Sequence, residues 1–392
     1  MKKQKVLMVG DAVIDTGFGR VTNSLVKYLR EDFDISILGV NYWGDPHDLG
    51  VKVYPAGTKT PGDLYGYTKL PRVLEAENPD IIFIFNDIWV INTYLIEIKK
   101  YYSSNKQPFP KIVIYFPVDA KDHDPDWYAN LDAVNIAVVY NQFGLSVAKQ
   151  AKEFNYRVIG HGVDSEDFYK INDTKENLRR KLFSKDSSFD DAFIVLNANR
   201  NQPRKRLDLT LLGFAQFAKN KPDNVKLYMH SGYMDAHINT AKLATRLGID
   251  KRLILTTTNV GPQVVSKQML NTIYNICDVG INTSLGEGFG LTPVEHAATG
   301  AAQIVPNSSA SGELFSDCGL LLDRGHDFLL DTIYTTGYLV NPDEVAEKLE
   351  MLYNDRVLLN TLGEKARAKF TSKEFSWEYI AGQWKELFRE LK

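Results

Sequence analysis

A glycine-rich segment, residues 278–295, holds the side chains best suited to chemistry, Glu287 and Glu295, eight positions apart. It begins with an apolar run that indicates a buried strand, and Pro293 stands where the first turn of a helix accepts a proline. Backbone amides at that helix start would bind a phosphate. These amides are those of Gly290, Leu291 and Thr292. The two carboxylates can accept hydrogen bonds from vicinal hydroxyls, as on a sugar and a ribose, or each can be a surface or helix-terminus charge.

A second segment is strongly basic. Four cations fall within seven residues, between the apolar run Phe193–Leu196 and an amphipathic helix expected from Leu207. They are Arg200, Arg204, Lys205 and Arg206. Cations between a strand end and a helix start suit a doubly charged anion such as a pyrophosphate. A solvated basic loop or a nucleic-acid patch is the alternative.

A third loop, Gly10–Arg20, follows the first apolar run and leads into a helix expected to begin near Val21. Gly17 and Gly19 would let backbone amides approach an anion at the helix start. The loop lacks the GxGxxG spacing of a dinucleotide-binding fold, so the same glycines could simply form a tight turn.

The elements that must position these loops alternate between short apolar runs and amphipathic helices, and the alternation occurs twice. The runs are Val6–Val9, Ile35–Val40, Ile81–Phe85, Ile112–Phe116, Ile136–Val139, Phe193–Leu196, Val225–Met229, Leu253–Leu255, Val279–Ile281 and Gln303–Val305. Continuous apolar runs suit parallel strands covered on both faces. The predicted fold class is therefore α/β, with two Rossmann-like, doubly wound domains that bind ligands at strand-to-helix loops. The charged, serine-rich segment Asp173–Asp191 is expected to be an interdomain linker with a short helix.

Length and composition agree with two soluble domains. The 392 residues include 46 Lys and Arg against 49 Asp and Glu, a formal charge of −3, with 44% hydrophobic and 24% charged residues. This balance excludes a disordered chain and a strongly basic nucleic-acid binder. The two cysteines, Cys277 and Cys318, have no paired spacing and fit a reducing compartment. Since no run approaches 18 apolar residues, we expect a cytoplasmic protein with at most peripheral membrane contact.

Taken together, the loops resemble those of retaining glycosyltransferases of the GT-B fold, family 4 (glycosyl transferases group 1). The sequence GEGFG at Gly286–Gly290, with Glu295, is similar to the E-x7-E signature of that family. Arg200 and Lys205, five positions apart after a strand, match the Arg and Lys with which the family holds the donor diphosphate.

Two further segments fit the same family. The sequence HGVD at residues 161–164 is similar to its interdomain segment, and FSW at residues 375–377 to the entry of its C-terminal helix. The resemblance covers essentially the whole chain. It implies an acceptor-binding domain at 1–165, a nucleotide-sugar-binding domain at 166–370, and a helix at 371–392 that crosses back to the first domain, with a central cleft between the domains.

The resemblance implies transfer of a sugar from a nucleoside-diphosphate sugar to an acceptor hydroxyl, without a metal and with retention at the anomeric carbon. A UDP- or GDP-sugar is the expected co-substrate. Arg200 and Lys205 would neutralise the leaving diphosphate, and Glu295 would bind the ribose. Glu287 would position the sugar and stabilise charge rather than act as the base. The expected catalytic residues are Glu287, Lys205, Arg200 and Asp119, and the expected substrate-binding residues are Gly17, Phe18, Gly19, His161, Asn199, Phe289, Gly290, Leu291, Thr292 and Glu295.

One position departs from the family pattern. Many members carry a His after the fourth strand, near the sugar, where this chain reads IYFPVDAKDH at residues 114–123. We expect Asp119, or else His123, to occupy that place; otherwise they are a turn-capping Asp and a surface His. His161 is expected to be either a cleft contact or an interdomain hinge residue. The loop at Gly17–Gly19 would close over the donor phosphates from the other domain.

No metal is expected. Two DxD patterns, Asp32–Asp34 and Asp124–Asp126, match formally the metal-binding motif of a different transferase fold. Neither lies in a convincing strand-end metal loop, and Pro125 indicates a turn.

Several functions and partners stay open. The same scaffold serves sugar-nucleotide epimerases and phosphorylases, and a non-catalytic sugar-nucleotide-binding or scaffold protein is a further alternative. Nucleic acid is not expected as a partner unless it is the acceptor. The unidentified acceptor is expected to contact Tyr42–Asp45, Asn86–Trp89 and Asp119–Trp127, where aromatic side chains suggest sugar stacking.

Overall fold

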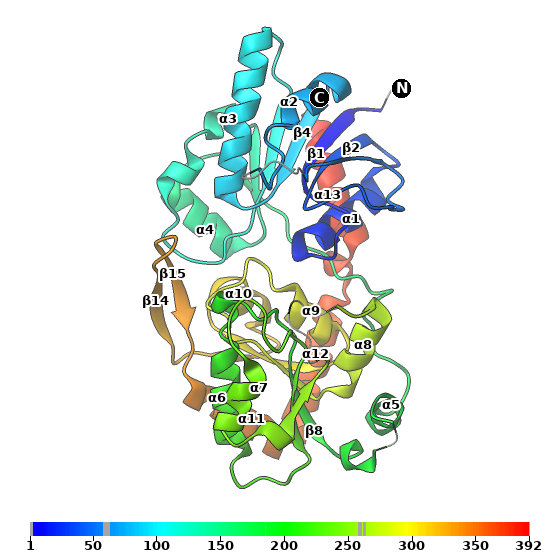
Figure 1. The fold of residues 1–392 in the computed structure, drawn as a ribbon, viewed down its shortest axis with the longest axis vertical. Helices are drawn as coiled ribbons and strands as arrows, with labels where there is room; N and C mark the ends of the chain where they lie inside the picture. Colours follow the sequence, from blue (N-terminus) through cyan, green and yellow to red (C-terminus); the bar gives the residue numbers. More distant parts are fainter. Residues whose placement is uncertain (1–2, 58–62, 185, 258–260, 262–263, 392) are drawn as a thin grey trace. The chain divides into compact units, whose positions relative to one another are not determined.

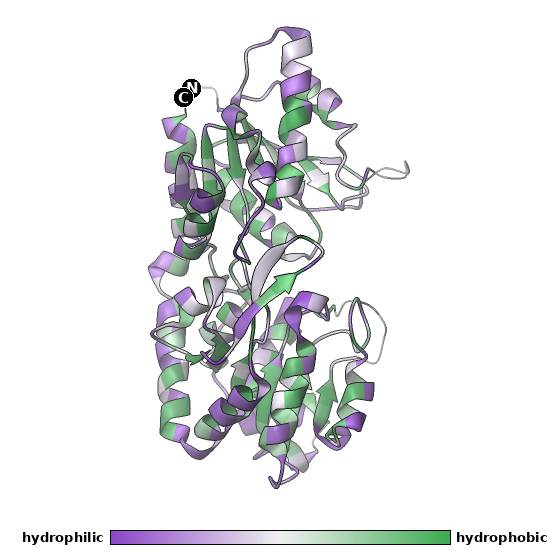
Figure 2. Ribbon diagram, turned by 90° about the vertical axis from the view of Figure 1, so that its left-hand side faces the viewer, coloured by the Kyte–Doolittle hydropathy of each residue, from purple (hydrophilic) through white to green (hydrophobic). Residues whose placement is uncertain are grey.

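The computed structural model describes residues 3–57, 63–184, 186–257, 261 and 264–391. The chain divides into two compact units (Figure 1), a first unit of Met1–Gly162 with Trp377–Lys392 and a second unit of Val163–Ser376. Each unit has its own parallel sheet and its own hydrophobic core. Figure 2 shows the hydrophobic residues concentrated along the strands of both sheets.

The first unit is built on a seven-stranded parallel sheet with the strand order β3-β2-β1-β4-β5-β6-β7. Its strands are β1 (Lys5–Asp11), β2 (Asp34–Val40), β3 (Lys52–Pro55), β4 (Ile81–Phe85), β5 (Lys111–Tyr115), β6 (Ile136–Val139) and β7 (Tyr156–Val158). The central strand β4 is buried along its whole length, as expected of a strand covered on both faces. The order reverses between β1 and β4, so the loops that follow these two strands lie side by side at the carboxyl edge of the sheet.

The helices of the first unit are α1 (Gly17–Leu29), α2 (Leu70–Glu77), α3 (Ile88–Asn105), α4 (Gln142–Ala151), η1 (Pro125–Tyr128), η2 (Leu131–Ala133) and the C-terminal α13 (Trp377–Glu390). Trp384 of α13 is fully buried, with ring centroids 4.9 Å from Phe83 and 4.8 Å from Tyr115. On its polar side, Lys385 pairs with Asp32 at 2.7 Å. The predicted return of a C-terminal helix to the first domain is therefore confirmed.

The start of α1 differs from the prediction. The helix begins at Gly17 rather than near Val21, because Thr16 is its N-cap and accepts a hydrogen bond from the Gly19 amide at 2.9 Å. A Cβ on Gly19 would lie 2.2 Å from the carbonyl oxygen of Ile14, so only glycine fits there. Gly17, Phe18 and Gly19 thus form the first turn of a helix and not a loop.

The second unit is built on a six-stranded parallel sheet with the order β10-β9-β8-β11-β12-β13, and a separate antiparallel hairpin. The strands are β8 (Phe193–Asn197), β9 (Val225–Met229), β10 (Leu253–Leu255), β11 (Val279–Ile281), β12 (Ala302–Pro306) and β13 (Leu320–Leu322), with β14 (His326–Leu330) and β15 (Thr335–Leu339) in the hairpin. The helices are α5 (Lys175–Leu182), α6 (Leu207–Ala218), α7 (Thr240–Arg246), α8 (Lys267–Ile276), α9 (Leu291–Ala298), α10 (Ser309–Phe315), α11 (Pro342–Asn354) and α12 (Arg356–Phe370), and the 3₁₀ helices are η3 (Ser187–Phe189), η4 (Pro203–Lys205), η5 (Asp250–Arg252) and η6 (Lys373–Phe375).

The interdomain linker predicted over Asp173–Asp191 is wrong. This segment lies within the second unit, where Arg179 of α5 is buried and donates to Asp278 at 2.8 Å. The same guanidinium donates to the carbonyl oxygens of Ile276 and Ala192. The short helix expected in this segment is present as α5, and one arginine in it ties α5 to the start of β11.

Within the described ranges, no helix has the length and apolar character needed to cross a bilayer.

Candidate functional site

Two loops of the second unit meet because the strands before them are neighbours. β8 and β11 pair in parallel, and the loops 198–206 and 282–290 leave the same edge of the sheet. The amide of Leu285 donates to the carbonyl oxygen of Arg204 at 2.8 Å, and the hydroxyl of Thr283 donates to that of Arg206 at 2.8 Å. The basic loop and the glycine-rich loop are therefore fixed against each other.

The centre of this arrangement is a buried ion pair between Lys205 and Glu287. The Lys205 ammonium lies 2.5 and 2.7 Å from the two carboxylate oxygens, and both residues are more than nine-tenths buried. Asn282 donates to the same carboxylate at 3.2 Å, and Arg204 approaches it at 3.5 Å. A buried carboxylate with these partners is a fixed negative charge that holds a cation at the strand edge.

The protonation of Glu287 follows from these contacts. Burial alone would raise its pKa, but the charges of Lys205 and Arg204 and the hydrogen bonds from Lys205 and Asn282 outweigh it and lower the pKa to about 2. The carboxylate is therefore ionised at neutral pH and a poor proton acceptor. This electrostatics agrees with a positioning role better than with that of a general base.

The backbone of Glu287 is held by the segment after β12. Its amide donates to the hydroxyl of Ser309 at 3.0 Å, and its carbonyl oxygen accepts from the amide of Ala310 at 3.2 Å. Ser309 adopts a φ of 50°, in the left-handed region. Neither Ser309 nor Asn282 was predicted from the sequence. The only available signal was that each polar residue comes shortly after an apolar strand.

The helix start predicted after the glycines is present. α9 begins at Leu291, and Gly290 precedes it with a φ of 86°, a conformation that favours glycine. A Cβ on Gly290 would lie 3.7 Å from the Cβ of Glu287, so the helix start lies next to the ion pair. The amides of Leu291 and Thr292 belong to the first turn of α9, where intrahelical acceptors are absent. An anion can bind at this end of the helix.

Glu295 lies one turn further into α9 and is buried. It accepts a hydrogen bond from the hydroxyl of Tyr274 at 3.2 Å. The Tyr274 ring stacks on that of His296, with centroids 5.2 Å apart. Glu295 is thus positioned by α8, the helix that carries Tyr274, a partner that the sequence did not predict.

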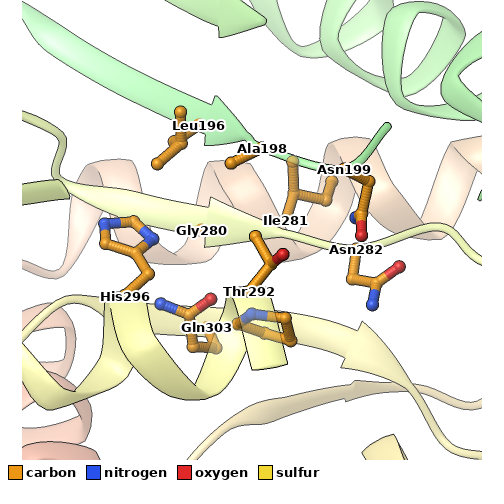
Figure 3. A pocket seen from close by; sticks show the side chains of 10 residues that line it. Leu196, Ala198, Asn199, Gly280, Ile281, Asn282, Thr292, His296 and Gln303 are labelled. Carbon is orange, nitrogen blue, oxygen red and sulfur yellow. The ribbon is translucent and has the colours of Figure 1, made fainter. Parts of the chain in front are cut away.

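A small cavity of about 10 Å³ lies between β8, β11 and α9 (Figure 3), about the size that holds one water. Asn199, Asn282 and Thr292 line it together with His296 and Gln303. Asn199 is buried and donates through its amide and side chain to the Oδ1 of Asn197. The His296 pKa is lowered to about 3 by burial, so this ring is neutral. Asn199 and Thr292 therefore meet, as expected of residues predicted in one site.

The side chain of Arg200 pairs with a different carboxylate from that of Lys205. Its guanidinium pairs with Asp235, which follows β9, at 2.7 Å, and its side chain is half exposed. Phe289 is buried. Of the residues predicted in the second unit, the structure therefore brings Lys205, Glu287 and the start of α9 together and places Arg200 at the rim in an ion pair.

Three predicted site residues of the first unit, His161, Asp119 and His123, lie at or near the carboxyl edge of its sheet. His161 is buried, with its Nδ1 2.8 Å from the Tyr115 hydroxyl, and burial lowers its pKa to about 3. Asp119 is half-buried in the loop after β5. His123 is buried, with its Nδ1 2.8 Å from the hydroxyl of Tyr128, and burial, against the charge of Asp119, lowers its pKa to about 4. It is a packed neutral histidine and not the surface His considered above.

Both DxD patterns have structural partners. Asp32 pairs with Lys385 and with Arg389 on α13, at 2.7 Å each. Asp124 caps η1 by accepting from the amide of Asp126 at 2.9 Å. Among the residues that the structure describes, no group of three or more His, Cys, Asp or Glu side chains could hold a metal ion.

Comparisons with known proteins agree with this geometry. Residues 178–369 match the family model of glycosyl transferases group 1. An uncharacterized glycosyltransferase of Methanocaldococcus jannaschii, MJ1178, is 31% identical over 117 residues, which are 29% of this chain and 28% of that protein. The match thus spans less than a third of that relative.

Two solved structures share the fold at low identity. The crystal structure of Anabaena Alr3699/HepE in complex with UDP and glucose has a TM-score of 0.71 and 16% identity, over 99% of this chain and 100% of that chain. Sucrose-phosphate synthase from Thermosynechococcus elongatus has a TM-score of 0.72 and 16% identity, over 99% of both chains. The chain thus has the GT-B fold with its two doubly wound sheets, and its segment 178–369, just under half of the chain, belongs to the glycosyl transferases group 1 family.

Proposed function

We propose that the chain transfers a sugar from a nucleoside-diphosphate sugar to an acceptor hydroxyl, with retention at the anomeric carbon and without a metal. The observation that carries the proposal is the buried Lys205–Glu287 pair beside the glycine-led start of α9. A cation and free helix amides at one strand edge stabilise the charge that builds on a departing diphosphate.

In the proposed step the bond from the sugar anomeric carbon to the diphosphate oxygen breaks, and its electron pair leaves with the diphosphate. The acceptor oxygen forms the new bond on the same face. Its proton passes to the departing phosphate, so no enzymic base is needed. Glu287, ionised and held by Lys205 and Asn282, positions the donor sugar through hydrogen bonds from sugar hydroxyls.

The roles of the remaining residues follow from their positions. We propose that Lys205 and Arg200 contact the diphosphate, with Arg200 exchanging Asp235 for a phosphate oxygen. Glu295 is proposed to bind the ribose, and Leu291 and Thr292 to bind phosphate through their amides. Gly17, Phe18 and Gly19 are proposed to contribute from α1, and Asp119 and His161 from the acceptor-binding unit.

A uridine donor is the first choice for testing, because the similar Anabaena protein forms a complex with UDP and glucose. A GDP-sugar is the second. The two buried free thiols, Cys277 and Cys318, support a reducing compartment, so we propose a cytoplasmic site of action.

The test is a panel of UDP-, GDP- and ADP-sugars with the full-length protein, with and without chelator. We expect one donor to raise the melting temperature and to be slowly cleaved whether or not chelator is present. Lys205→Ala should abolish cleavage, whereas Lys242→Ala, an exposed lysine of α7, should leave it unchanged. Binding of a donor without cleavage would favour a non-catalytic sugar-nucleotide-binding protein. Donor cleavage that Lys205→Ala does not reduce would contradict the assigned diphosphate site.

A further inference from the structure

The carboxyl edge of the first sheet is acidic. The segments that follow β1, β2, β4, β5 and β6, residues 12–20, 41–51, 86–88, 116–126 and 140–142, carry eight aspartates against one arginine and one lysine. The cations are Arg20 and Lys121. Because all these strands are parallel, the segments leave the same edge of the sheet. A ligand there meets a negative potential.

A buried hydroxyl points to a ligand at this edge. Tyr140 directly follows β6 and is 6% exposed, and its hydroxyl finds no hydrogen-bond partner among the described residues. Its ring is fixed between Tyr115 and His161, with centroids 4.6 and 4.2 Å away. The hydroxyl of Tyr115, in contrast, bonds to His161 and to the carbonyl oxygen of Ile159. A buried hydroxyl without a partner is unfavourable, and a bound ligand or water removes that cost.

Two carboxylates accompany this hydroxyl. Asp87 follows β4 and Asp119 follows β5, and β4, β5 and β6 are adjacent in the sheet. The pKa of Tyr140 is raised by burial and then by Tyr115, Asp87 and Asp119, which places these carboxylates within electrostatic range of it. Asp87 stands at the N-cap of α3.

Tyr65 adds a second phenol to this group. It is half-buried, and its pKa is raised by burial and by the charges of Asp87 and Asp11. Asp11 itself is buried and bonded to Thr16 and Asn41, so it belongs to the scaffold of the edge.

A pair of tryptophans, one exposed and one partly buried, lies in the same loops. Trp89, in the first turn of α3, is 40% exposed and packs edge-on against Trp127 of η1, with centroids 5.2 Å apart. The side chain of Asn92 donates to the carbonyl oxygen of Asp126 at 3.3 Å and so joins α3 to η1. An exposed tryptophan such as Trp89 beside carboxylates suits a carbohydrate, because the ring covers the apolar face of a sugar while carboxylates accept hydrogen bonds from its hydroxyls.

We propose that this edge binds the acceptor and that the acceptor is an uncharged carbohydrate. Its hydroxyls bond to Tyr140, Asp87 and Asp119, and a sugar ring lies on Trp89. The aspartates disfavour acceptors that carry a phosphate or a carboxylate, since like charges repel. This inference rests on the proposed function and adds the chemical class of the acceptor to it.

The experiment uses the full-length protein and two sets of probes. The neutral set contains tetrasaccharides of glucose, galactose, mannose and N-acetylglucosamine, and the anionic set contains glucose 6-phosphate, glucuronate and a polyprenyl phosphate. Binding is followed by ligand-observed NMR, and transfer is followed with the donor found in the panel above. We expect binding and transfer for a member of the neutral set only.

Three variants and a control sharpen this test. Tyr140→Phe should lower acceptor kcat/KM at least tenfold while donor cleavage stays unchanged, and Trp89→Ala should raise the acceptor KM. The double substitution Asp87→Asn with Asp119→Asn should weaken the discrimination against glucose 6-phosphate. Asp34→Asn removes one carboxylate at the opposite edge of the sheet, at the start of β2, and should change neither the acceptor kinetics nor the discrimination against glucose 6-phosphate.

Preference for an anionic acceptor, or intact donor cleavage with neither binding nor transfer for any neutral probe, would overturn the inference. A Tyr140→Phe protein with wild-type melting temperature and wild-type acceptor kinetics would do the same. Failure of the proposed function gives a different result, namely absence of donor cleavage, and the NMR binding of neutral against anionic probes then still decides the acceptor class.

Discussion

The two sheets of the molecule have the same architecture and opposite chemistry at their carboxyl edges. In the second unit, the loop after β8 carries Arg200, Arg204, Lys205 and Arg206 and no acidic residue. In the first unit, the corresponding loops are rich in aspartate, and the exposed side chains include Trp43 and Trp89. The doubly wound topology thus determines where ligand-binding loops lie, whereas their residues determine which ligand they accept.

The two edges also differ in how their polar groups are satisfied. Glu287 has Lys205, Asn282 and Arg204 as partners, so its charge is compensated without a ligand. Tyr140 is buried and has no partner among the described residues. Removal of one member of such a buried pair leaves the other charge uncompensated and therefore costs stability and activity together. A buried hydroxyl without a partner costs folding free energy, and we propose that a bound acceptor removes that cost at Tyr140.

The largest effect is expected at Lys205. Lys205→Ala leaves the Glu287 carboxylate buried with Arg204 and Asn282 alone and removes a cation from the proposed diphosphate site. Turnover should fall by about 10²–10³-fold or more, and the second unit should lose on the order of 3 kcal/mol. Donor turnover and thermal unfolding measure the two effects.

A double variant separates stability from catalysis at this pair. Lys205→Met combined with Glu287→Leu removes both charges, so the melting temperature should recover while turnover stays lost. Recovery of turnover in the double variant would refute the electrostatic role of the pair.

The next effect concerns pH. The pKa of Glu287 is about 2 in the folded protein against 4.5 as the ordinary value, so its pairing stabilises the fold above about pH 4.5. That contribution, on the order of 3 kcal/mol, is lost as the pH falls from 4.5 towards 2. Glu287→Gln should therefore flatten the decline of melting temperature between pH 5 and pH 3.

Asp331→Asn, in the turn between β14 and β15, is the control and should leave the pH profile as in the wild type. An unchanged profile in Glu287→Gln as well would show that other groups dominate the acid unfolding of this unit.

A smaller effect is expected at Gly290. Its φ of 86° is strained for any residue with a Cβ, so Gly290→Ala should destabilise the second unit by about 1–2 kcal/mol. Because the substitution also tilts the first turn of α9, the affinity for the donor should decrease. Gly248→Ala, at a φ of 72° after α7, is the matched control, since it carries the same strain away from the site. Equal losses of donor affinity in both variants would contradict phosphate binding at α9.

The sequence predicted the interior strands of both sheets and the edge strand β10 (Leu253–Leu255), but not the edge strands β3, β7 and β13. The apolar runs Ile81–Phe85 and Val225–Met229 coincide with β4 and β9, because central parallel strands are buried on both faces and must be apolar throughout. The edge strands β3 and β7 are short and partly exposed, and strand β14 of the hairpin is largely exposed. Their sequences therefore do not form continuous apolar runs.

The site was predictable in its residue types and not in its pairings. Lys205 and Glu287 were both expected, but their contact joins residues 82 positions apart and depends on the conformation of two loops. The pairing of Arg200 with Asp235 has the same origin. At α1, glycines suggested a loop, because glycine is a poor helix former, whereas the Thr16 cap extends the helix over them.

The smallest effect compares two tyrosines of one cluster. Tyr115→Phe removes a hydroxyl bonded to His161 and to a carbonyl oxygen, and should destabilise the first unit by about 1–2 kcal/mol. Tyr140→Phe removes a hydroxyl with no partner among the described residues, so the melting temperature should stay unchanged or rise slightly. Thermal unfolding of both variants measures the difference. Equal destabilisation would mean that the Tyr140 hydroxyl is already satisfied in the free protein; an unchanged melting temperature combined with lost acceptor transfer would assign that hydroxyl to the acceptor.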